Sequence, residues 1–482
     1  MRRWKVSLLI LGQASLVLGL AAAIRSGAVP LGVRDDWEWL RVRLRPDPLL
    51  FGLAVAAILL YVGFAAAGAR SLARGHGAVG WLIALVPIAV ATQAAVQEGA
   101  PAGHGLAKWG IALHSSGSSG YYSVAKSQIR DLRAFLAAYP DWIGHQDALH
   151  VGTHPPGLFL LAWGALRAME SNPPLARAVA SRFPTSLDQA FQSLGPGRPL
   201  PLADRAALAI MGFATMCACS ATVIPLYLLA RSRLSATASW SAATLWPLVP
   251  AALLFQPTAD TAFPLLSTSA LALAGWSDRR PALAVLAGLV MAAGAQFSLV
   301  FFPIGLIAAL VYSTMTEVTP RRRLALIGLT GAGFLGLTFA VWAFSGANPF
   351  SIWRTNALNH ARFYVQFPRR YWAWVAENPV ELVVAIGLPT VAWAGCGLRS
   401  APKVVAATLA TLVGLTLSGK NLSEVGRLWL PMMPPLLVAA GAGMVRLDAR
   451  AIGLAATLFL LGLQTLILQT TIQVVYPFTV LP

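Results

Sequence analysis

The residues best suited to chemistry in this chain lie just ahead of an apolar segment, in HVGTHPPGLFLLAWGALRAM (150–169). His150 and His154 precede a double proline, and Asp147 comes three residues before the first of them. Imidazole and carboxylate groups in one short stretch can transfer protons and can hydrogen-bond to a charged substrate. The prolines remove two backbone donors and push the residues before them out of the helical region. We therefore expect His154 to be presented at the start of a helix, with Pro156 in its first turn.

A second group of ionisable residues precedes another apolar span, in SGKNLSEVGRLWLPMMPP (418–435). Glu424 and Arg427 are three residues apart, so a helix beginning there would place them on one face. A charge at the bilayer centre costs about 2.5–3.5 kcal/mol on insertion scales, so these groups should face water, a partner or a substrate. An ion pair that anchors the helix end and a substrate-binding pair are equally good interpretations.

Three histidines between 145 and 154 raise the question of a metal site. No HExxH or comparable framework is present, and the proline turn interrupts helical spacing after His154. We therefore predict no metal ligands here and expect the imidazoles to hydrogen-bond to a substrate or a lipid phosphate. Cys217, Cys219 and Cys396 fall in apolar spans without disulfide or metal spacing, and we predict that they are core residues.

Two further segments have the composition of a membrane interface. Residues 121–139 place apolar side chains at roughly helical spacing with charges between them, which predicts an amphipathic interfacial helix. Residues 351–376 mix tryptophan, tyrosine and phenylalanine with arginine and histidine, which is typical of an aromatic belt and would also suit an anionic headgroup. Asp260, alone in QPTADTAFPLL, is expected near the outer end of its span, where packing and cavity lining both stay open.

The composition places these motifs in a membrane protein. Hydrophobic residues make up 57% of the chain and charged residues 11%, whereas soluble domains have about 45–50% and about 25%. We predict an all-α fold, a polytopic transmembrane bundle of about 13 spans (12–14), with amphipathic interfacial helices in its outer loops. The expected spans lie near 6–24, 49–67, 79–97, 155–170, 206–230, 235–255, 260–277, 281–295, 297–315, 322–344, 379–397, 402–418, 427–445 and 450–471.

The net charge of +18 is distributed over short loops between these spans, for example at 231–233, 321–323 and 446–450. That is the positive-inside pattern, which predicts that the N-terminus and these loops are cytoplasmic. No basic run is interleaved with exposed aromatics, so no nucleic-acid partner is expected. The long segments 25–48, 98–154 and 345–378 then fall on the outer face.

We divide the chain into three parts. Residues 1–97 hold three N-terminal spans with the outer loop 25–48, residues 98–445 form the core with the outer loops 98–154 and 345–378, and residues 446–482 hold the last span and a tail. One inconsistency remains in the core, because a cytoplasmic Arg231 needs an odd number of crossings after residue 154 and hydropathy offers two segments. Segment 155–170 could be partly inserted, which would leave 171–205 external.

The order of these motifs resembles the GT-C superfamily of polytopic membrane glycosyltransferases. The likeness comprises the aromatic-rich outer loop, HPPG opening a span, Asp204-Arg205 opening a span that ends in LLARSRL, and Glu-x-x-Arg-Leu-Trp-Leu-Pro-x-x-Pro-Pro at 424–435. The last motif resembles the protein-mannosyltransferase-like branch, and residues 348–381 look like a loop of uncharacterised bacterial members. The likeness covers roughly residues 98–445, and the order and spacing of the motifs carry it, since no single one is specific.

The resemblance implies a hexosyl- or pentosyltransferase that uses a polyprenyl-phosphate sugar on the outer face of the bacterial inner membrane, in glycan biosynthesis of the cell envelope. The acceptor would be a lipid, a glycan or a protein. One carboxylate would act as general base, while arginine or lysine would stabilise the departing lipid phosphate. Apolar grooves would hold the polyprenyl tail among membrane lipids. No cofactor is certain, although family members often bind a divalent cation, Mg²⁺ or Mn²⁺, weakly.

The chain departs from the family pattern at one point. Members usually carry an acid just before an aromatic pair in the first large outer loop, where this chain reads Ser118-Ser119-Gly120-Tyr121-Tyr122. The catalytic base is therefore assigned to Asp131 or Asp147, and Asp131 could instead be a solvated face residue. The residues assigned to the donor phosphate are Arg427, Lys420, Arg370 and His154. Those assigned to substrate binding are Glu424, His150, Tyr121, Tyr122 and His360.

Two other classes of protein would share much of this pattern. A transporter or flippase of a lipid-linked saccharide would also have many spans and outward basic residues. Transporters often show internal repeats with broken helices in matching halves. No convincing repeat is present and the outer segments are asymmetric, which favours an enzyme. A polysaccharide polymerase or ligase would share the donor chemistry and differ in its acceptor.

Overall fold

The computed structural model describes residues 2–28, 31–194 and 199–474, so the end of the predicted tail, 475–482, lies outside the described residues, as do the side chains of Arg2 and Arg3. Over these ranges the fold is all-α, as predicted, with only two pairs of two-residue strands. β1 (Gly32–Val33) pairs with β2 (Trp37–Glu38), and β3 (Leu40–Arg41) pairs with β4 (Ile472–Gln473), both antiparallel. The second pair ties the loop 25–48 to the end of the last helix.

Within the described ranges, six apolar stretches are long enough to cross a membrane. They are α1 (Arg2–Ser26), α2 (Pro48–Ala73), α3 (Val79–Glu98), α10 (Leu202–Ala221) running on into α11 (Val223–Arg231), α17 (Pro320–Ser345) and α24 (Arg450–Thr471). A seventh candidate is α19 (Tyr371–Ile386) with α20 (Leu388–Gly397), whose axes are bent by 101°. The all-α fold is thus confirmed, and these helices are compatible with a multi-pass membrane protein, with fewer long candidate spans than the 13 expected.

The other expected spans are short or broken helices. They are α12 (Ala236–Leu245), η3 (Trp246–Leu248), α13 (Pro250–Leu254), η4 (Ala259–Thr261), α14 (Phe263–Trp276), α15 (Ala282–Ala295), α16 (Phe301–Ser313), η5 (Leu398–Ser400), α21 (Lys403–Leu417), α22 (Val425–Leu428), η6 (Leu430–Met432) and α23 (Pro434–Arg446). Prolines account for the breaks at 247–250 and 431–435, because proline cannot donate the next helical hydrogen bond. A helix of 14 residues such as α15 is about 21 Å long, shorter than the roughly 30 Å hydrocarbon core.

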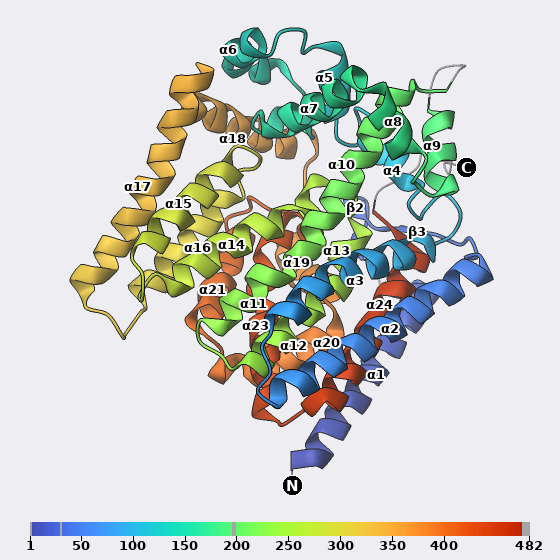
Figure 1. Cartoon of the computed structure of the whole chain (residues 1–482), viewed down its shortest axis with the longest axis vertical. Coiled ribbons are helices and arrows are strands. Elements are labelled where there is room, and N and C mark those ends of the chain that lie inside the picture. The colour runs from blue at the N-terminus through green and yellow to red at the C-terminus, as the bar shows by residue number, and fades with distance from the viewer. Residues whose placement is uncertain (1, 29–30, 195–198, 475–482) are drawn as a thin grey trace.

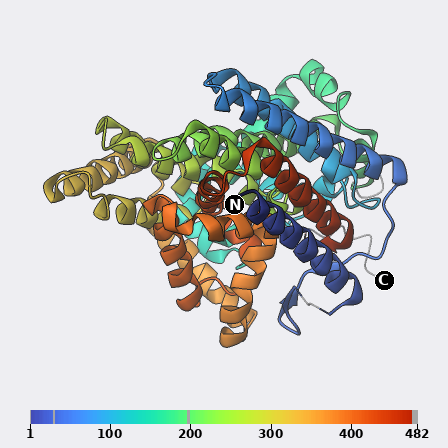
Figure 2. The same cartoon turned by 90° about the horizontal axis from the view of Figure 1, so that it is seen from below.

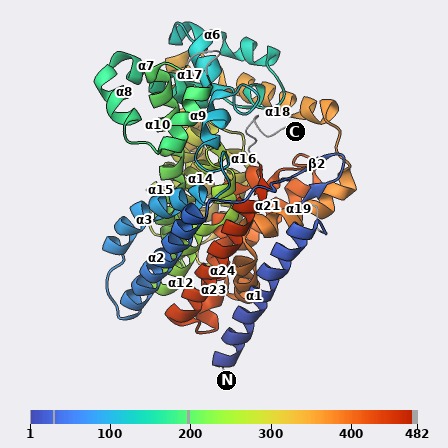
Figure 3. The same ribbon diagram turned by 90° about the vertical axis from the view of Figure 1, so that its right-hand side faces the viewer.

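The remaining helices gather at one end of the bundle, drawn at the top of Figure 1 and again in Figure 3. They are α4 (Lys108–His114), α5 (Tyr121–Ser127), α6 (Leu132–Trp142), η1 (Ile143–His145), η2 (Val151–Thr153), α7 (Gly157–Ser171), α8 (Pro173–Ala180), α9 (Thr185–Ser193) and α18 (Pro349–Gln366). We call this end the helical cap. α7 lies in the cap, and Leu202–Arg231 is one candidate span. This arrangement is compatible with a single crossing between residue 154 and Arg231, as the predicted topology requires.

The interfacial helix expected over 121–139 is in fact two helices, α5 and α6. The break falls at Asp131, whose backbone is extended and whose side chain accepts a hydrogen bond from the Ala134 amide at 2.6 Å. Asp131 is therefore an N-cap, which starts a new helix instead of continuing the old one.

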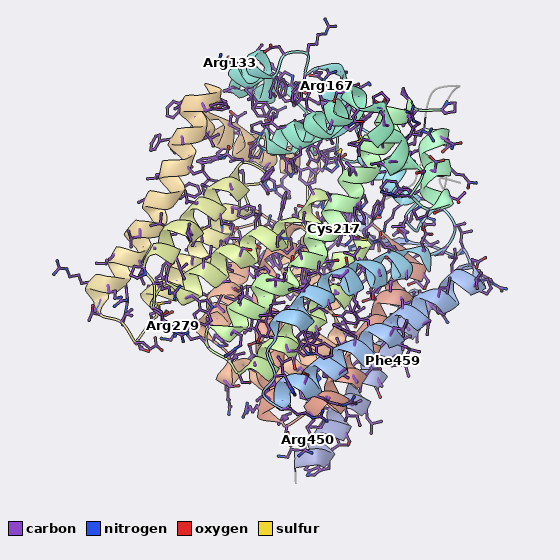
Figure 4. The ribbon with its side chains drawn as sticks, in the orientation of Figure 1. Arg133, Arg167, Cys217, Arg279, Arg450 and Phe459 are labelled. Carbon is purple, nitrogen blue, oxygen red and sulfur yellow. The ribbon has the colours of Figure 1, made fainter. Side chains whose placement is uncertain are left out.

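Basic residues mark both ends of the molecule. Figure 4 shows Arg133 and Arg167 on the helical cap and Arg279 and Arg450 at the opposite end of the bundle. Seen along the bundle in Figure 2, α1 lies beside α24, and these two helices are in contact. α1 and α2 thus pack against the last helix. α3 also contacts the cap, because Trp109 Nε1 of α4 donates to Gln97 at 2.9 Å and Ser186 Oγ of α9 donates to Glu98 at 2.8 Å.

Candidate functional site

A polar cluster forms where the helical cap meets the bundle, around Arg427 of α22. Its Nη2 lies 2.7 Å from Glu424 Oε2, and its Nε lies 3.7 Å from Asp260 Oδ2 in η4. The three side chains are 20%, 26% and 19% exposed, respectively. The Nε atom is buried and has no hydrogen-bond partner among the described residues. A buried donor without a partner costs about 1–3 kcal/mol, so this atom is a natural contact for an anionic ligand.

Two histidines adjoin this cluster as neutral groups. Burial, together with the nearby charge of Arg427, lowers the pKa of His150 to about 3. Burial likewise lowers the pKa of His154, whose Nδ1 lies 2.9 Å from the His150 carbonyl oxygen. Burial would lower the pKa of Arg427, but Glu424 and Asp260 outweigh it and raise that pKa. Near neutral pH the cluster therefore holds one guanidinium and two uncharged imidazoles.

The histidine segment is held in place by α6 and α18. The His154 carbonyl oxygen accepts hydrogen bonds from Tyr139 Oη at 2.8 Å and Asn356 Nδ2 at 3.2 Å. The Gly152 carbonyl oxygen accepts from Asn356 at 2.9 Å and from Asn359 at 2.8 Å. His154 itself is extended, with φ −116° and ψ 143°, and α7 begins three residues later. The prediction that His154 stands at the start of a helix is thus confirmed.

The loop carrying Glu424 is held by α18 and α19. Tyr364 Oη donates to the Lys420 carbonyl oxygen at 3.0 Å and accepts from the Leu422 amide at 2.9 Å. The buried Glu381 accepts from the Gly426 amide at 2.8 Å. The expected helical pair at Glu424 and Arg427 exists, although Glu424 precedes α22 as its cap and does not lie within a longer helix.

Ser423 and Glu424 adopt positive φ angles of 84° and 53°. Residues other than glycine rarely adopt this left-handed conformation, and each one that does lowers the stability of the fold by about 1–3 kcal/mol. Strain of this kind persists only where neighbouring contacts enforce it. Here those contacts come from α18 and α19, and the strained turn aims Glu424 at Arg427.

The two tyrosines at the start of α5 point to different places. Tyr121 lies edge-on to His154 and Phe159, with ring centroids 5.6 and 5.3 Å apart. Burial and the nearby Asp260 raise its pKa. Tyr122 instead donates to the buried Asp204, away from the cluster, in a very short hydrogen bond. The structure therefore brings Tyr121 to the cluster and leaves Tyr122 outside it.

The carboxylates predicted as the base both make local backbone contacts. Asp131 is exposed and caps α6, and within the described part of the chain no hydrogen bond or ion pair joins it to the cluster. Asp147 accepts from the Leu149 amide at 2.8 Å and the His150 amide at 2.9 Å. It is near enough to Tyr121 to raise the pKa of that phenol, so it lies at the edge of the cluster.

The other predicted residues lie at the rim or elsewhere. Lys420 is exposed, and together with burial it lowers the pKa of His360 on α18. Arg370 is 59% exposed and pairs with Asp36 of the first outer loop, with Nε–Oδ1 at 3.0 Å. Trp374 Nε1 also donates to Asp36, at 3.0 Å. The structure thus uses Arg370 to fix that loop and does not bring it to Arg427.

Sequence reasoning missed three residues that build the site. Asn356 and Asn359 on α18 are buried and bond the histidine segment, and Glu381 is buried in α19. The sequence contained a pattern that could have identified each of these three residues. The two amides are three residues apart on one predicted helix, and an acid inside an apolar span marks functional or structural importance.

An apolar cavity of about 260 Å³ lies between α15, α16 and α17. Phenylalanine and leucine side chains line it, and Gly305 and Gly331 leave room in its walls. The ring of Phe301, which lines the cavity, contacts Phe263 with centroids 6.1 Å apart. Phe263 opens α14, three residues after Asp260 in the chain.

Among the described residues, no group of three or more His, Cys, Asp or Glu side chains could hold a metal ion. The three cysteines are free thiols within helices or spans, and Cys219 is buried. Comparison with known proteins finds no matching family model, no similar curated protein and no similar solved structure.

Proposed function

We propose that this protein is a membrane glycosyltransferase of GT-C type, which moves a sugar from a polyprenyl-phosphate donor to an acceptor at the helical cap. The observation that carries the proposal is the unpartnered Nε of Arg427, buried between Glu424 and Asp260 beneath two neutral imidazoles. An arginine in this setting suits a phosphate, because the guanidinium stays charged and donates through several N–H groups. In this proposal the cap faces the outside of a bacterial inner membrane.

Asp260 is the best-placed general base in this scheme. Its only side-chain contact among the described residues is the long ion pair with Arg427, whereas Asp131 and Asp147 are taken up by backbone amides. The acceptor hydroxyl would attack the anomeric carbon and give its proton to Asp260. The bond from that carbon to the phosphate oxygen would break, and the electron pair would leave with the lipid phosphate.

Neutral His150 and His154 can donate a hydrogen bond without adding charge, which suits sugar hydroxyls or phosphate oxygens. Lys420 and His360 would stand at the rim of the site. The apolar cavity between α15, α16 and α17 offers a surface for part of the polyprenyl chain. Each of these roles supports a donor with a charged head and a hydrocarbon tail.

The residues present do not fit the divalent cation that the resemblance implies. Asp260 and Glu424, the two cluster acids, both face the guanidinium of Arg427, which balances one of their two negative charges. A divalent cation between them would be repelled by that guanidinium. We therefore assign no step to a metal.

The test is sugar transfer by purified full-length protein in liposomes, with a panel of radiolabelled polyprenyl-phosphate sugars. Asp260→Asn should lower the turnover by roughly 10²–10⁴-fold, as expected for loss of a general base. Arg427→Ala should also abolish transfer. Asp448→Asn, which removes an exposed carboxylate near α24, is the matched control and should match the wild type.

A different result would redirect the assignment. Equal transfer by Asp260→Asn and wild type would remove Asp260 as the base. No transfer with any donor, combined with movement of labelled lipid between leaflets, would support the transporter instead.

A further inference from the structure

A second cavity lies at the end of the bundle opposite the helical cap. Four connections between helices meet there, residues 231–235, 277–281, 314–323 and 398–403. Figure 4 shows Arg279, from the second of these, far from Arg133 and Arg167 on the cap. We call this region the basal pocket.

Ion pairs and hydrogen bonds join the connections around the basal pocket. Arg233 Nη2 lies 2.9 Å from Asp278 Oδ2, and Arg322 Nη2 donates to the Asp278 carbonyl oxygen at 2.6 Å. Lys403 Nζ donates to Thr316 Oγ1 at 3.3 Å and to the Thr314 carbonyl oxygen. These contacts fix the positions of Arg233 and Lys403 on opposite connections.

The basal pocket has an apolar floor and a charged rim. Its volume is about 180 Å³. Three buried side chains form the floor: Leu271 of α14, Val311 of α16 and Met315, which lies two residues after the end of α16. Arg233 and Lys403 stand at the rim. A floor that excludes water beside a pair of cations suits an amphipathic anion better than a simple ion.

The charge around the basal pocket is strongly positive. The four connections carry nine basic residues and two acidic ones, Asp278 and Glu317. Asp278 is already paired with Arg233. Glu317 lines the rim, where a hydrogen bond from its own backbone amide, together with Arg233 and Lys403, lowers its pKa. The rim therefore offers two cations and one carboxylate acceptor close together.

We propose that the basal pocket binds an anionic phospholipid whose headgroup also carries hydroxyl groups, as phosphatidylglycerol does. Its phosphate lies between Arg233 and Lys403, a headgroup hydroxyl donates to Glu317, and the first part of an acyl chain covers the floor. Basic pockets between transmembrane helices bind anionic headgroups in this way. The site is separate from the polar cluster and does not depend on sugar transfer.

The carboxylate of Glu317 favours this phospholipid over a polyprenyl phosphate. Both ligands supply a phosphate and a hydrocarbon chain, but only the phospholipid headgroup supplies hydroxyl donors for a carboxylate. A bare phosphate monoester would place its negative oxygens beside Glu317, which is unfavourable. The positive-inside pattern alone explains the excess of arginine but leaves the apolar floor unexplained.

The experiment is native mass spectrometry of the delipidated full-length protein after incubation with one lipid at a time. Phosphatidylglycerol should remain bound more strongly than phosphatidylcholine with the same acyl chains. Lys403→Gln should weaken retention of phosphatidylglycerol by about tenfold, as expected for loss of one charge-assisted hydrogen bond. Arg399→Gln removes an exposed cation of the same connection that does not line the pocket, and it should retain the lipid as the wild type does.

A second variant tests the floor without changing the charge. Met315→Trp fills the pocket and should lower retention of phosphatidylglycerol while leaving the elution volume of the protein unchanged. Equal retention of both phospholipids, or equal effects of Lys403→Gln and Arg399→Gln, would overturn the proposal. Stronger retention of polyprenyl phosphate, or complete displacement of the lipid by an equal concentration of glycerol 3-phosphate, would also overturn it.

Discussion

Arg427 stands between two carboxylates at unequal distances, 2.7 Å from Glu424 and 3.7 Å from Asp260. The short contact uses Nη2, so it fixes the guanidinium, and the long contact leaves Nε without a hydrogen-bond partner. Glu424 therefore orients the arginine, and Asp260 is the carboxylate with the longer and weaker contact. In the proposed mechanism, this asymmetry makes Glu424 the positioning carboxylate and Asp260 the general base.

Replacing Arg427 with lysine tests whether the shape of the cation matters. Lysine keeps the charge but cannot contact Glu424 and a phosphate oxygen from one planar fork. We expect the kcat/KM for sugar transfer to fall by roughly 10²-fold or more, the usual effect of losing a preorganised donor to developing charge. Steady-state transfer assays with the best donor of the panel measure it. Unchanged kinetics would mean that only charge is required at this position.

The strained turn before α22 predicts that a glycine at position 423 gives a more stable protein than an alanine there. Ser423 has φ 84°, so Ser423→Gly should be more stable than Ser423→Ala by about 1 kcal/mol. Both variants lose the hydroxyl that Arg369 Nε approaches at 3.4 Å, so the comparison isolates the backbone. Midpoints of thermal unfolding in detergent measure the difference. The opposite order would show that the left-handed conformation is not enforced in the folded protein.

Much of the fold could be predicted from the sequence because its determinants are local. Long apolar runs predicted the membrane-type helices, and the double proline predicted that a helix, α7, starts just after His154. The number of long spans could not be predicted in the same way, because prolines inside apolar runs end helices without changing hydropathy. The interval 235–255, for example, reads as one span and folds as α12, η3 and α13.

The candidate site was harder to predict, since its members come from distant segments. The pair of Glu424 and Arg427 is local and was found, whereas Asp260 is 167 residues away from Arg427 and could only be noted as a lone acid. Asp131 was proposed as a base because it is an outer acid beside arginines, but its role as an N-cap depends on where α6 begins. Residue type alone does not separate a reactive carboxylate from one that caps a helix.

Asn359 should be essential for the position of the histidine segment. Its Nδ2 donates to the carbonyl oxygens of Ile143 at 3.0 Å and Gly152 at 2.8 Å, both in the cap. Asn359→Leu removes both hydrogen bonds, and it leaves the Gly152 carbonyl oxygen with Asn356 and the Ile143 carbonyl oxygen with the Gln146 amide. The loss of two bonds should lower the free energy of unfolding by about 1–3 kcal/mol. Transfer activity should fall with it, because His150 and His154 lose their support.

Limited proteolysis separates a local effect from global unfolding in this variant. New cleavage between 143 and 154, with the rest of the chain protected, is the expected pattern. Gln366→Leu serves as the control, because that amide is exposed at the end of the same helix, α18. Identical digestion of the Asn359 variant and the wild type would contradict the anchoring role.

His150 should make the protein sensitive to acid. Burial lowers its folded pKa to about 3, below its value of about 6.5 in the unfolded chain. Between these two values the unfolded state binds more protons, so stability falls as the pH drops from 6.5 toward 3, by at most about 1.4 kcal/mol per pH unit. His150→Gln should show a shallower loss of thermal stability over this window. His76→Gln, an exposed control, should keep the wild-type slope.

The buried amine of Lys108 should make the stability of the protein depend on pH in the alkaline range. It is fully buried in α4, and among the described residues its Nζ donates only to the Leu254 carbonyl oxygen, at 3.1 Å. Burial lowers its pKa to about 7, whereas the unfolded chain has about 10.5. Between pH 7 and 10.5 the unfolded state therefore binds more protons, and wild-type stability should rise with pH by at most about 1.4 kcal/mol per unit.

Lys108→Met removes the ionisable amine and keeps most of the side-chain volume. At pH 7 it should unfold at a higher temperature than the wild type, and its advantage should shrink steadily as the pH approaches 10. Lys420→Met, at an exposed position near the cap, should leave the wild-type slope intact. A parallel pH dependence of Lys108→Met and wild type would show that the amine is already solvated, because only a desolvated lysine couples proton binding to unfolding in this range.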